Sequence, residues 1–370
     1  MIITFWLCII LLTHIYAFYP ASLRLLLAIV GKRAPQKQQM PDLPKVSVII
    51  SAHNEENVIE EKIQNTLAFE YPKDKMEILI GDDGSNDRTA EILESYSSQI
   101  LLFKNEKNEG KAAMLNKLCA EAKGEFLLFS DANTIVREDA LKNIIAEFSD
   151  GRTGCVCGKL VLEAENFDLS KTESIYWKGE SRLKFLESGF GAVMGSNGAL
   201  YAIRSSLYCK LPTHKVVMDD FYITAKILMK NYASVFCENA LAFEKASASK
   251  LGEFKRKIRI SRANFNFLFD FLPLLSPLHP MKAYMFLSHK LLRWLSPFLL
   301  IVLFSCSILL MEEHIFYKIF LAIELFFIAF ALIGIKAFKY FLSMNFALFL
   351  GFCKSFFKEK GGAWKRIERG

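Results

Sequence analysis

The sequence of 370 residues lacks the features that mark several common classes of protein. Its eight cysteines run from Cys8 to Cys353 without a C-x-x-C pair, so neither a paired-cysteine zinc site nor a disulfide framework is expected. We predict that all eight are small buried side chains in a reducing compartment. The net charge of only +7 provides no strongly basic surface, and nucleic acid is therefore not an expected partner.

Positive charge is also missing ahead of the first apolar run, which extends from Ile2 to about Tyr19. A signal peptide would carry basic residues before its apolar core and small residues at a cleavage site after it. Here the basic residues, beginning with Arg24 and Lys32, come only after the run. We therefore predict that residues 1–30 form a retained transmembrane anchor whose positive flank stays in the cytoplasm.

The sequence is rich in apolar residues, with 52% hydrophobic content and a mean hydropathy of +0.23. Residues 294–310 and 315–335 are each long enough to cross the roughly 30 Å of hydrocarbon in a bilayer. Glu312 and Glu313 lie between them without positive charge, so we expect that turn to be external, and Lys336 to return the chain to the cytoplasm. These features predict a multi-pass protein of the cell (inner) membrane with its soluble part cytoplasmic.

Two segments near these spans are less uniformly apolar. We group them with the two C-terminal spans into one region, residues 263–370. Residues 281–292 carry basic side chains on an aliphatic and aromatic background, which predicts an amphipathic helix lying in the membrane interface. Residues 341–357 either cross the membrane or lie in its interface. The second alternative keeps the basic tail, residues 358–370, in the cytoplasm, as the charge distribution favours.

Between the membrane segments, short apolar runs alternate with helical stretches. After a linker over residues 32–44, strands are predicted at 46–50, 77–80, 100–103 and 125–129, and helices at 55–69, 88–96 and 111–122. Such short alternating units predict an α/β fold with a parallel sheet covered on both faces. This domain is expected to span residues 45–262.

Polar residues follow the first two predicted strands, where ligands of open α/β sheets bind. Ser51-Ala-His-Asn-Glu-Glu56 comes after the first strand, and two aspartates end the second. The plainer explanation is that Asn54 and the Asp-rich turn cap the helices that follow. The candidates for a nucleoside site at this edge are Ala52, Asn54, Glu55, Asp82 and Asp83.

The next two motifs suit a phosphate and a metal ion. Gly110 and Lys111 begin a predicted helix, where backbone N–H groups and a cation favour phosphate oxygens, although a solvated helix cap has the same pattern. The buried strand Phe126-Leu-Leu-Phe129 is followed by Asp131 and Asn133, two positions apart on one face of an extended chain. That pair suits a divalent cation, Mg²⁺ or Mn²⁺, which would neutralise a diphosphate.

The runs VSVIISAHNEE, EILIGDDGSNDRT, NEGKAAMLN and FLLFSDANT, in this order, closely resemble the inverting family 2 glycosyltransferases, which have the GT-A nucleotide-diphospho-sugar transferase fold. The resemblance implies that Asp83, with Asp82 beside it, holds the base of the nucleotide and that Lys111 lies near its phosphates. It also implies that Asp131 is the metal-site carboxylate of the Asp-x-Asp motif. Asn133 departs from that motif and provides a neutral ligand instead.

The resemblance extends to two later motifs. Gly195, Asn197 and Gly198 stand in a segment that resembles the acceptor side of the family, although the glycines would also serve a turn. Asp219 and Asp220 begin a predicted helix, where acids also complement the helix dipole. The resemblance places the general base in this pair, at Asp220.

A basic cluster, Arg256-Lys-Ile-Arg-Ile-Ser-Arg262, comes just before the C-terminal membrane segments. Its plainer explanation is a basic flank in contact with lipid headgroups. By resemblance it occupies the place of a Gln-x-x-Arg-Trp motif, in which Arg259 would neutralise the departing diphosphate. Arg256 replaces the glutamine and Ile260 the tryptophan, which argues against a processive synthase.

Together the motifs and the resemblance imply a membrane-bound, metal-dependent glycosyltransferase. It would move a sugar from a nucleotide-diphospho-sugar, in our expectation a UDP-sugar, to a glycan or lipid-linked acceptor with inversion, in cell-surface polysaccharide biosynthesis. Its expected partners are the donor, the acceptor and the lipid bilayer. Two alternatives stay open: a synthase that loads a sugar onto polyprenyl phosphate, and a non-catalytic scaffold subunit of a polysaccharide synthase complex.

Overall fold

The computed structural model describes residues 1–33, 42–163, 167–245 and 250–357. The predicted linker over residues 32–44 lies mostly outside these ranges, and the basic tail over 358–370 wholly outside them. All eight cysteines fall within the described residues and are free. Cys119, Cys209 and Cys353 are only half-buried, so the prediction of burial is correct for the other five.

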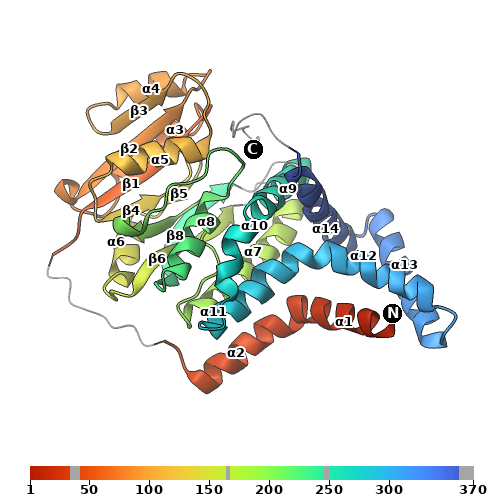
Figure 1. Cartoon of the computed structure of the whole chain (residues 1–370). Coiled ribbons are helices and arrows are strands. Elements are labelled where there is room, and N and C mark those ends of the chain that lie inside the picture. Colours follow the sequence, from red (N-terminus) through yellow and green to blue (C-terminus); the bar gives the residue numbers. More distant parts are fainter. Residues whose placement is uncertain (34–41, 164–166, 246–249, 358–370) are drawn as a thin grey trace.

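The centre of the fold is one eight-stranded sheet with the strand order β3-β2-β1-β4-β7-β6-β8-β5 (Figure 1). Its strands are β1 Val46–Ala52, β2 Met76–Asp83, β3 Leu101–Asn105, β4 Phe126–Phe129, β5 Ile135–Val136, β6 Thr153–Glu163, β7 Tyr201–Arg204 and β8 Ala233–Lys245. The strands β1 to β4 are parallel, as predicted. Every residue of β1 is buried, because helices cover both faces of the sheet there, and its sequence is correspondingly apolar except for Ser47 and Ser51.

The predicted parallel arrangement does not extend to the other half of the sheet. The strand β7 runs antiparallel to both β4 and β6, and β5 runs antiparallel to β8. Only β6 and β8 pair in parallel. Local periodicity identifies a strand, whereas the direction in which the chain returns to the sheet depends on the long segments between strands.

Helices of the soluble part cover both faces. They are α3 Ile59–Leu67, α4 Thr89–Ser95, α5 Lys111–Glu121, α6 Ala140–Glu147, α7 Phe167–Ser188, α8 Asp219–Met229 and α9 Lys250–Asn266, with 3-10 turns at Lys73–Lys75 and Ser205–Leu207. Side chains of α3, α4 and α6 form one apolar core with the sheet, and those of α5, α7 and α8 form a second. The second core also includes Tyr19, Phe286 and Trp294, so helices from both ends of the chain close that face.

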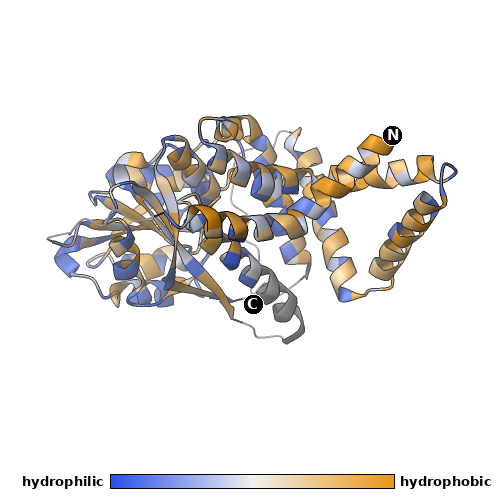
Figure 2. Cartoon of the chain, turned by 90° about the horizontal axis from the view of Figure 1, so that it is seen from below, coloured by the Kyte–Doolittle hydropathy of each residue, from blue (hydrophilic) through white to orange (hydrophobic). Residues whose placement is uncertain are grey.

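Three helical runs among the described residues are long and apolar enough to cross a membrane. The first joins α1 Ile2–Thr13 and α2 Tyr19–Val30 through a π-helical turn, His14–Phe18; the second joins α11 Pro280–Met285 and α12 Leu292–Leu310 through another, Phe286–Leu291; the third is α13 Ile315–Leu332. They pack together through Phe5, Leu303 and Tyr317. Figure 2 shows these helices extending, mostly hydrophobic, from a body of mixed polarity.

The segment predicted to be a separate interfacial helix, residues 281–292, instead continues into α12 as one run from Pro280 to Leu310. One of its basic side chains, His289, contacts two carboxylates of α7, Glu180 and Glu187, at 3.2 and 2.6 Å. That side chain therefore packs within the protein, and the position of the segment in the membrane interface stays a prediction.

The segment left open by the sequence, residues 341–357, falls mostly within α14 Lys336–Ser355. This helix packs on α9, where the Ser261 hydroxyl donates to the Leu348 carbonyl at 2.7 Å. It is not among the three candidate spans of the described chain. Between α9 and α11 the chain forms α10 Leu268–Phe271 and a 3-10 turn, Leu272–Leu275.

Candidate active site

A cavity of about 690 Å³ lies beyond the carboxyl ends of β1 and β4, between the starts of α5 and α8 and beside α9. Most of the predicted site residues line it: Glu55, Lys111, Asp131, Asn133, Gly195, Asn197, Gly198, Asp219, Asp220 and Arg259. The remaining four, Ala52, Asn54, Asp82 and Asp83, are not part of its lining. The fold thus gathers residues that are far apart in the sequence. The parallel strands β1 and β4 end at one edge of the sheet, and α5, α8 and α9 bring their side chains to the same edge.

Lys111 is the centre of this cluster. Its ammonium lies 2.7 Å from Asp131 Oδ1 and 3.3 Å from Asp219 Oδ1. It occupies the first position of α5, while Asp131 follows β4 and Asp219 begins α8. The buried Tyr201 hydroxyl approaches the second oxygen of Asp219 at 3.5 Å. One cation therefore links the end of the parallel half of the sheet to the helix that carries the acidic pair.

Asp220 is the carboxylate suited to proton transfer. Burial and the neighbouring Asp219 raise its pKa to about 6, although Lys111, the Phe221 N–H and Lys184 act in the opposite direction. The Phe221 N–H donates to Asp220 Oδ1 at 2.7 Å and fixes the side chain at the start of α8. A carboxylate whose pKa lies this close to neutrality can accept a proton from a substrate hydroxyl and release it again.

Arg259, on α9, offers an unused hydrogen-bond donor in the cavity wall. Its Nε is buried and has no hydrogen-bond partner among the described residues. Burial and Arg256 lower its pKa, while Asp131, Asp219 and Asp220 act to raise it. A buried N–H without an acceptor costs about 1–3 kcal/mol, so the position favours a bound anion.

Asp83 has another environment from the one predicted. It is fully buried, and its two oxygens accept from the Asn105 side chain at 2.9 Å and from the backbone N–H groups of Glu109 and Gly110 at 3.0 and 2.7 Å. Asp83 thus holds the loop that leads into α5. The carboxylate faces this loop and is not part of the cavity lining. The contact of Asp83 with the base of a nucleotide stays a prediction.

Asn54 joins the loop after β1 to the loop after β2, and Asp82 stabilises the second of these loops. The Asn54 side-chain oxygen accepts from the Asn86 N–H at 2.8 Å, and Asp82 accepts from the Ser85 hydroxyl at 2.5 Å. Gly84 completes this turn with a φ of +68°, and a Cβ there would lie 2.5 Å from the backbone of Lys107. Only glycine allows so close an approach in that conformation.

The three residues of the predicted acceptor-side segment, Gly195, Asn197 and Gly198, have different structural roles. Gly195 has a φ of +110°, and a Cβ on it would lie 2.9 Å from the Phe221 ring and 3.6 Å from Lys290 Nζ. Asn197 instead supports the sheet, because its amide donates to the Gly158 carbonyl at 3.0 Å. A Cβ on Gly198 would lie 3.1 Å from Asp131 Oδ2, so this glycine gives the backbone access to the predicted metal ligand.

A family model described as "Glycosyl transferase family 2" matches residues 47–207, which contain the strands and loops just described up to β7. These residues form a family 2 glycosyltransferase domain. The GT-A fold follows from a solved structure, a mannosyltransferase of Pyrobaculum calidifontis in complex with GDP-Man and Mn²⁺, which is 22% identical with a TM-score of 0.73 over 96% of this chain and 100% of that one.

Two curated relatives of the glycosyltransferase domain are similar in sequence. A probable glycosyltransferase YdaM of Bacillus subtilis is 29% identical over 252 residues, which are 64% of this chain and 59% of the relative. A poly-beta-1,6-N-acetyl-D-glucosamine synthase of Staphylococcus aureus is 25% identical over 224 residues, 59% of this chain and 54% of the relative. The chain therefore spans less than two thirds of the length of either relative.

Sequence reasoning missed Lys62, a buried residue of the glycosyltransferase domain. Its ammonium donates to the Ser130 hydroxyl and the Thr134 carbonyl, both at 2.7 Å, and so fixes the turn that carries Asp131. Burial lowers its pKa to about 7, and Asp131 acts to raise it. Nothing in the helical pattern of α3 distinguishes this lysine from an exposed one, because its partners lie about seventy residues away.

The residues available for a metal ion in the glycosyltransferase domain are Asp131 and Asn133. The Asn133 amide nitrogen donates to Glu244 at 3.4 Å, and its side-chain oxygen accepts no hydrogen bond within the described residues. No group of three or more His, Cys, Asp or Glu suited to a metal occurs in that part of the chain. One carboxylate and one amide oxygen fit a hard cation that takes its other ligands from water and a substrate diphosphate, although Lys111 shares the same Asp131 oxygen.

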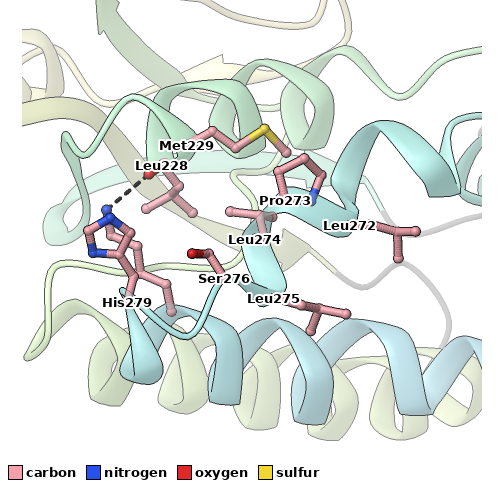
Figure 3. A pocket seen from close by; sticks show the side chains of 9 residues that line it. Leu228, Met229, Leu272, Pro273, Leu274, Leu275, Ser276 and His279 are labelled. Atoms are coloured by element: carbon pink, nitrogen blue, oxygen red, sulfur yellow. Dashed lines mark hydrogen bonds between the residues drawn. The ribbon is translucent and has the colours of Figure 1, made fainter.

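A second cavity, of about 470 Å³, lies between the end of α8 and the Leu272–Leu275 turn (Figure 3). Its walls are mainly apolar, with Ser276, His279 and Lys282 as the polar exceptions. The Lys282 ammonium donates to the Leu228 carbonyl at 2.9 Å. No carboxylate is among the described residues that line it, so this cavity offers no acidic side chain for proton transfer or metal binding, unlike the first cavity.

Proposed function

We propose that the chain is a membrane-bound glycosyltransferase that moves a sugar from a nucleotide-diphospho-sugar to a hydroxyl group of a glycan or lipid-linked acceptor, with inversion, in the assembly of cell-surface polysaccharide. The observation that carries the proposal is the cluster in the large cavity, where Lys111 pairs with Asp131 and Asp219 next to Asp220. The name of the staphylococcal relative, a poly-beta-1,6-N-acetyl-D-glucosamine synthase, supports the polysaccharide context.

In this proposal each side chain has one task. Asp220 takes the proton of the acceptor hydroxyl, for which a pKa of about 6 is suited. Arg259 and Lys111 offset the charge that develops on the departing diphosphate. Asp219 orients Lys111 through its ion pair. A cation held by Asp131 and Asn133 would, when bound, neutralise part of the same diphosphate charge.

The membrane part would place this chemistry at the cytoplasmic face of the inner membrane. We propose residues 1–30 as an anchor, 45–262 as the catalytic domain and 263–370 as C-terminal membrane helices. The support is the apolar composition of the three candidate spans and the basic residues that follow the first of them.

The decisive test is donor binding and hydrolysis by the full chain in detergent, across a panel of UDP- and GDP-sugars with and without Mn²⁺. We expect one donor class to bind, more tightly with Mn²⁺, and we expect Asp131→Asn to abolish the effect of the metal. The matched control is Asp139→Asn, which removes a carboxylate that pairs with Arg137 outside the cavity. Failure to bind any nucleotide sugar would favour a scaffold subunit instead.

A further inference from the structure

Two lysines on the acceptor side of the cavity form no ion pair with a carboxylate of the described residues. Lys184, on α7, is 7% exposed, and its hydrogen bond in the described structure goes to a weak acceptor, the Cys157 sulfur at 3.5 Å. Lys290, in the π-helical turn before α12, lies over the Phe221 ring at 5.4 Å. Neither ammonium forms an ion pair within the described residues, and both line the cavity.

Two of the nearby carboxylates, those of Glu180 and Glu187, already have partners. Glu180 pairs with Arg293 and with His289, and Glu187 accepts from Tyr19 at 2.6 Å, from the Met194 N–H at 2.9 Å and from His289. Lys184 and Lys290 are also within electrostatic reach of each other. The two ammonium groups repel each other, and the carboxylates that attract them, Glu180, Glu187 and Asp220, act from beyond ion-pair distance. Such a pair in a cavity wall is costly, and a bound anion would relieve part of that cost.

The position of the pair indicates what the anion belongs to. Asp220 acts electrostatically on Lys184, so the lysines stand on the side of the proposed base. Lys290 and Trp294, four residues apart on one helix face, both line the cavity, and that helix continues into a candidate membrane span. An acceptor attached to a lipid would enter along this wall.

We propose that Lys184 and Lys290 bind a phosphate group of the acceptor, so that the substrate is a phosphate-bearing, lipid-linked saccharide. The inference rests on the proposed function and names its acceptor class. The acceptor hydroxyl oxygen forms a bond to the anomeric carbon of the donor sugar, the bond from that carbon to the diphosphate oxygen breaks, and the nucleoside diphosphate leaves with the electron pair. The proton passes to Asp220, and the acceptor phosphate stays intact.

The test measures binding of three probes to the full chain in detergent: farnesyl phosphate, farnesol and glucose 1-phosphate. We expect farnesyl phosphate to bind and farnesol to fail at the same concentration. Lys184→Gln and Lys290→Gln should each weaken farnesyl phosphate binding by about 10-fold or more, since each removes a charge-assisted hydrogen bond. Lys290→Arg should retain most of the binding, and Lys142→Gln, on the exposed face of α6, should change nothing.

Nucleotide binding, measured on the same variants, separates the two proposals. If the lysine variants keep their nucleotide affinity but bind farnesyl phosphate more weakly, the phosphate subsite is supported. If glucose 1-phosphate binds as tightly as farnesyl phosphate, the phosphate group accounts for the binding and the lipid-linked part of the inference is contradicted. Parallel loss of nucleotide binding would place the lysines in the donor site and overturn the inference, as would farnesyl phosphate binding that is absent or indifferent to both lysines. A third result is that the chain binds farnesyl phosphate through the two lysines but binds no nucleotide sugar. That result would support the phosphate subsite and contradict the proposed transferase function.

Discussion

Asp83 is the last residue of β2 and Asp220 the second residue of α8, and their different surroundings indicate different roles. The oxygens of Asp83 are engaged by backbone and amide N–H groups of the loop before α5. Asp220 instead lines the cavity, and its pKa is raised by burial and by Asp219. A carboxylate that holds a loop is expected to affect folding and donor binding together, whereas a base affects only turnover.

Asp220→Asn therefore tests the proposed base. An amide keeps the shape of the side chain but cannot take the acceptor proton, so we expect kcat to fall by about 100-fold or more. Donor affinity, measured by titration of the nucleotide, should change little. A parallel loss of donor affinity would instead place Asp220 in the nucleotide site.

The pH dependence of the reaction follows from the same residue. A base acts only when deprotonated, so with a pKa of about 6 the value of kcat/KM should fall as the pH drops below about 6. Lys184 acts to lower that pKa, together with Lys111, against burial and Asp219. In Lys184→Gln the fall of kcat/KM at low pH should consequently begin at a higher pH. An unshifted pH profile of kcat/KM would argue that another group takes the proton.

At the scale of elements, contacts of α7 with helical segments near both ends of the chain hold the glycosyltransferase domain against two of the candidate membrane spans. Glu187 is fully buried, and it accepts from Tyr19 of α2 and contacts His289 of the π-helical turn. Burial alone would raise its pKa, but His289 and the hydrogen bonds from Met194 and Tyr19 hold that pKa below its ordinary value. The carboxylate thus joins three segments that are distant in sequence.

Glu187→Gln should lower the free energy of unfolding by about 2–3 kcal/mol, because an amide cannot accept from all these donors and leaves buried groups unpaired. Thermal unfolding of the full chain in detergent measures the change. The matched control is Glu91→Gln, an exposed residue whose ion pair with Arg88 should contribute little. Equal melting temperatures for the two variants would contradict a structural role for the contact.

At the scale of the whole molecule, the charge distribution predicts its orientation in the membrane. The turn between α12 and α13 carries Glu312 and Glu313, and we expect it outside the cell, with the glycosyltransferase domain inside. A membrane-impermeant maleimide should label Glu313→Cys in intact cells, and Ser97→Cys, in an exposed position of the domain, only after lysis. The unchanged chain controls for its own cysteines, and labelling of Ser97→Cys in intact cells would reverse the proposed orientation.

Much of this molecule could be predicted from local patterns. The parallel strands β1 to β4, the helix that begins at Lys111 and the apolar spans are all encoded within short windows, because burial on both faces of a sheet or in lipid demands continuous apolar runs. The ends of the parallel strands then identified Glu55, Asp131 and Asn133 in the cavity wall, since parallel strands end at a common edge, and the resemblance to a known family supplied most of the others.

Only the tertiary structure decided the rest. The direction of β7, the use of Asp83 to hold a loop and the burial of Lys62 beneath the Asp131 turn depend on which distant segments pack together. The same holds for the polar contacts of Glu187 on α7, which join residues 168 and 102 positions apart. A buried charge is stable only beside its partner, and a local sequence pattern specifies the charge but not the partner.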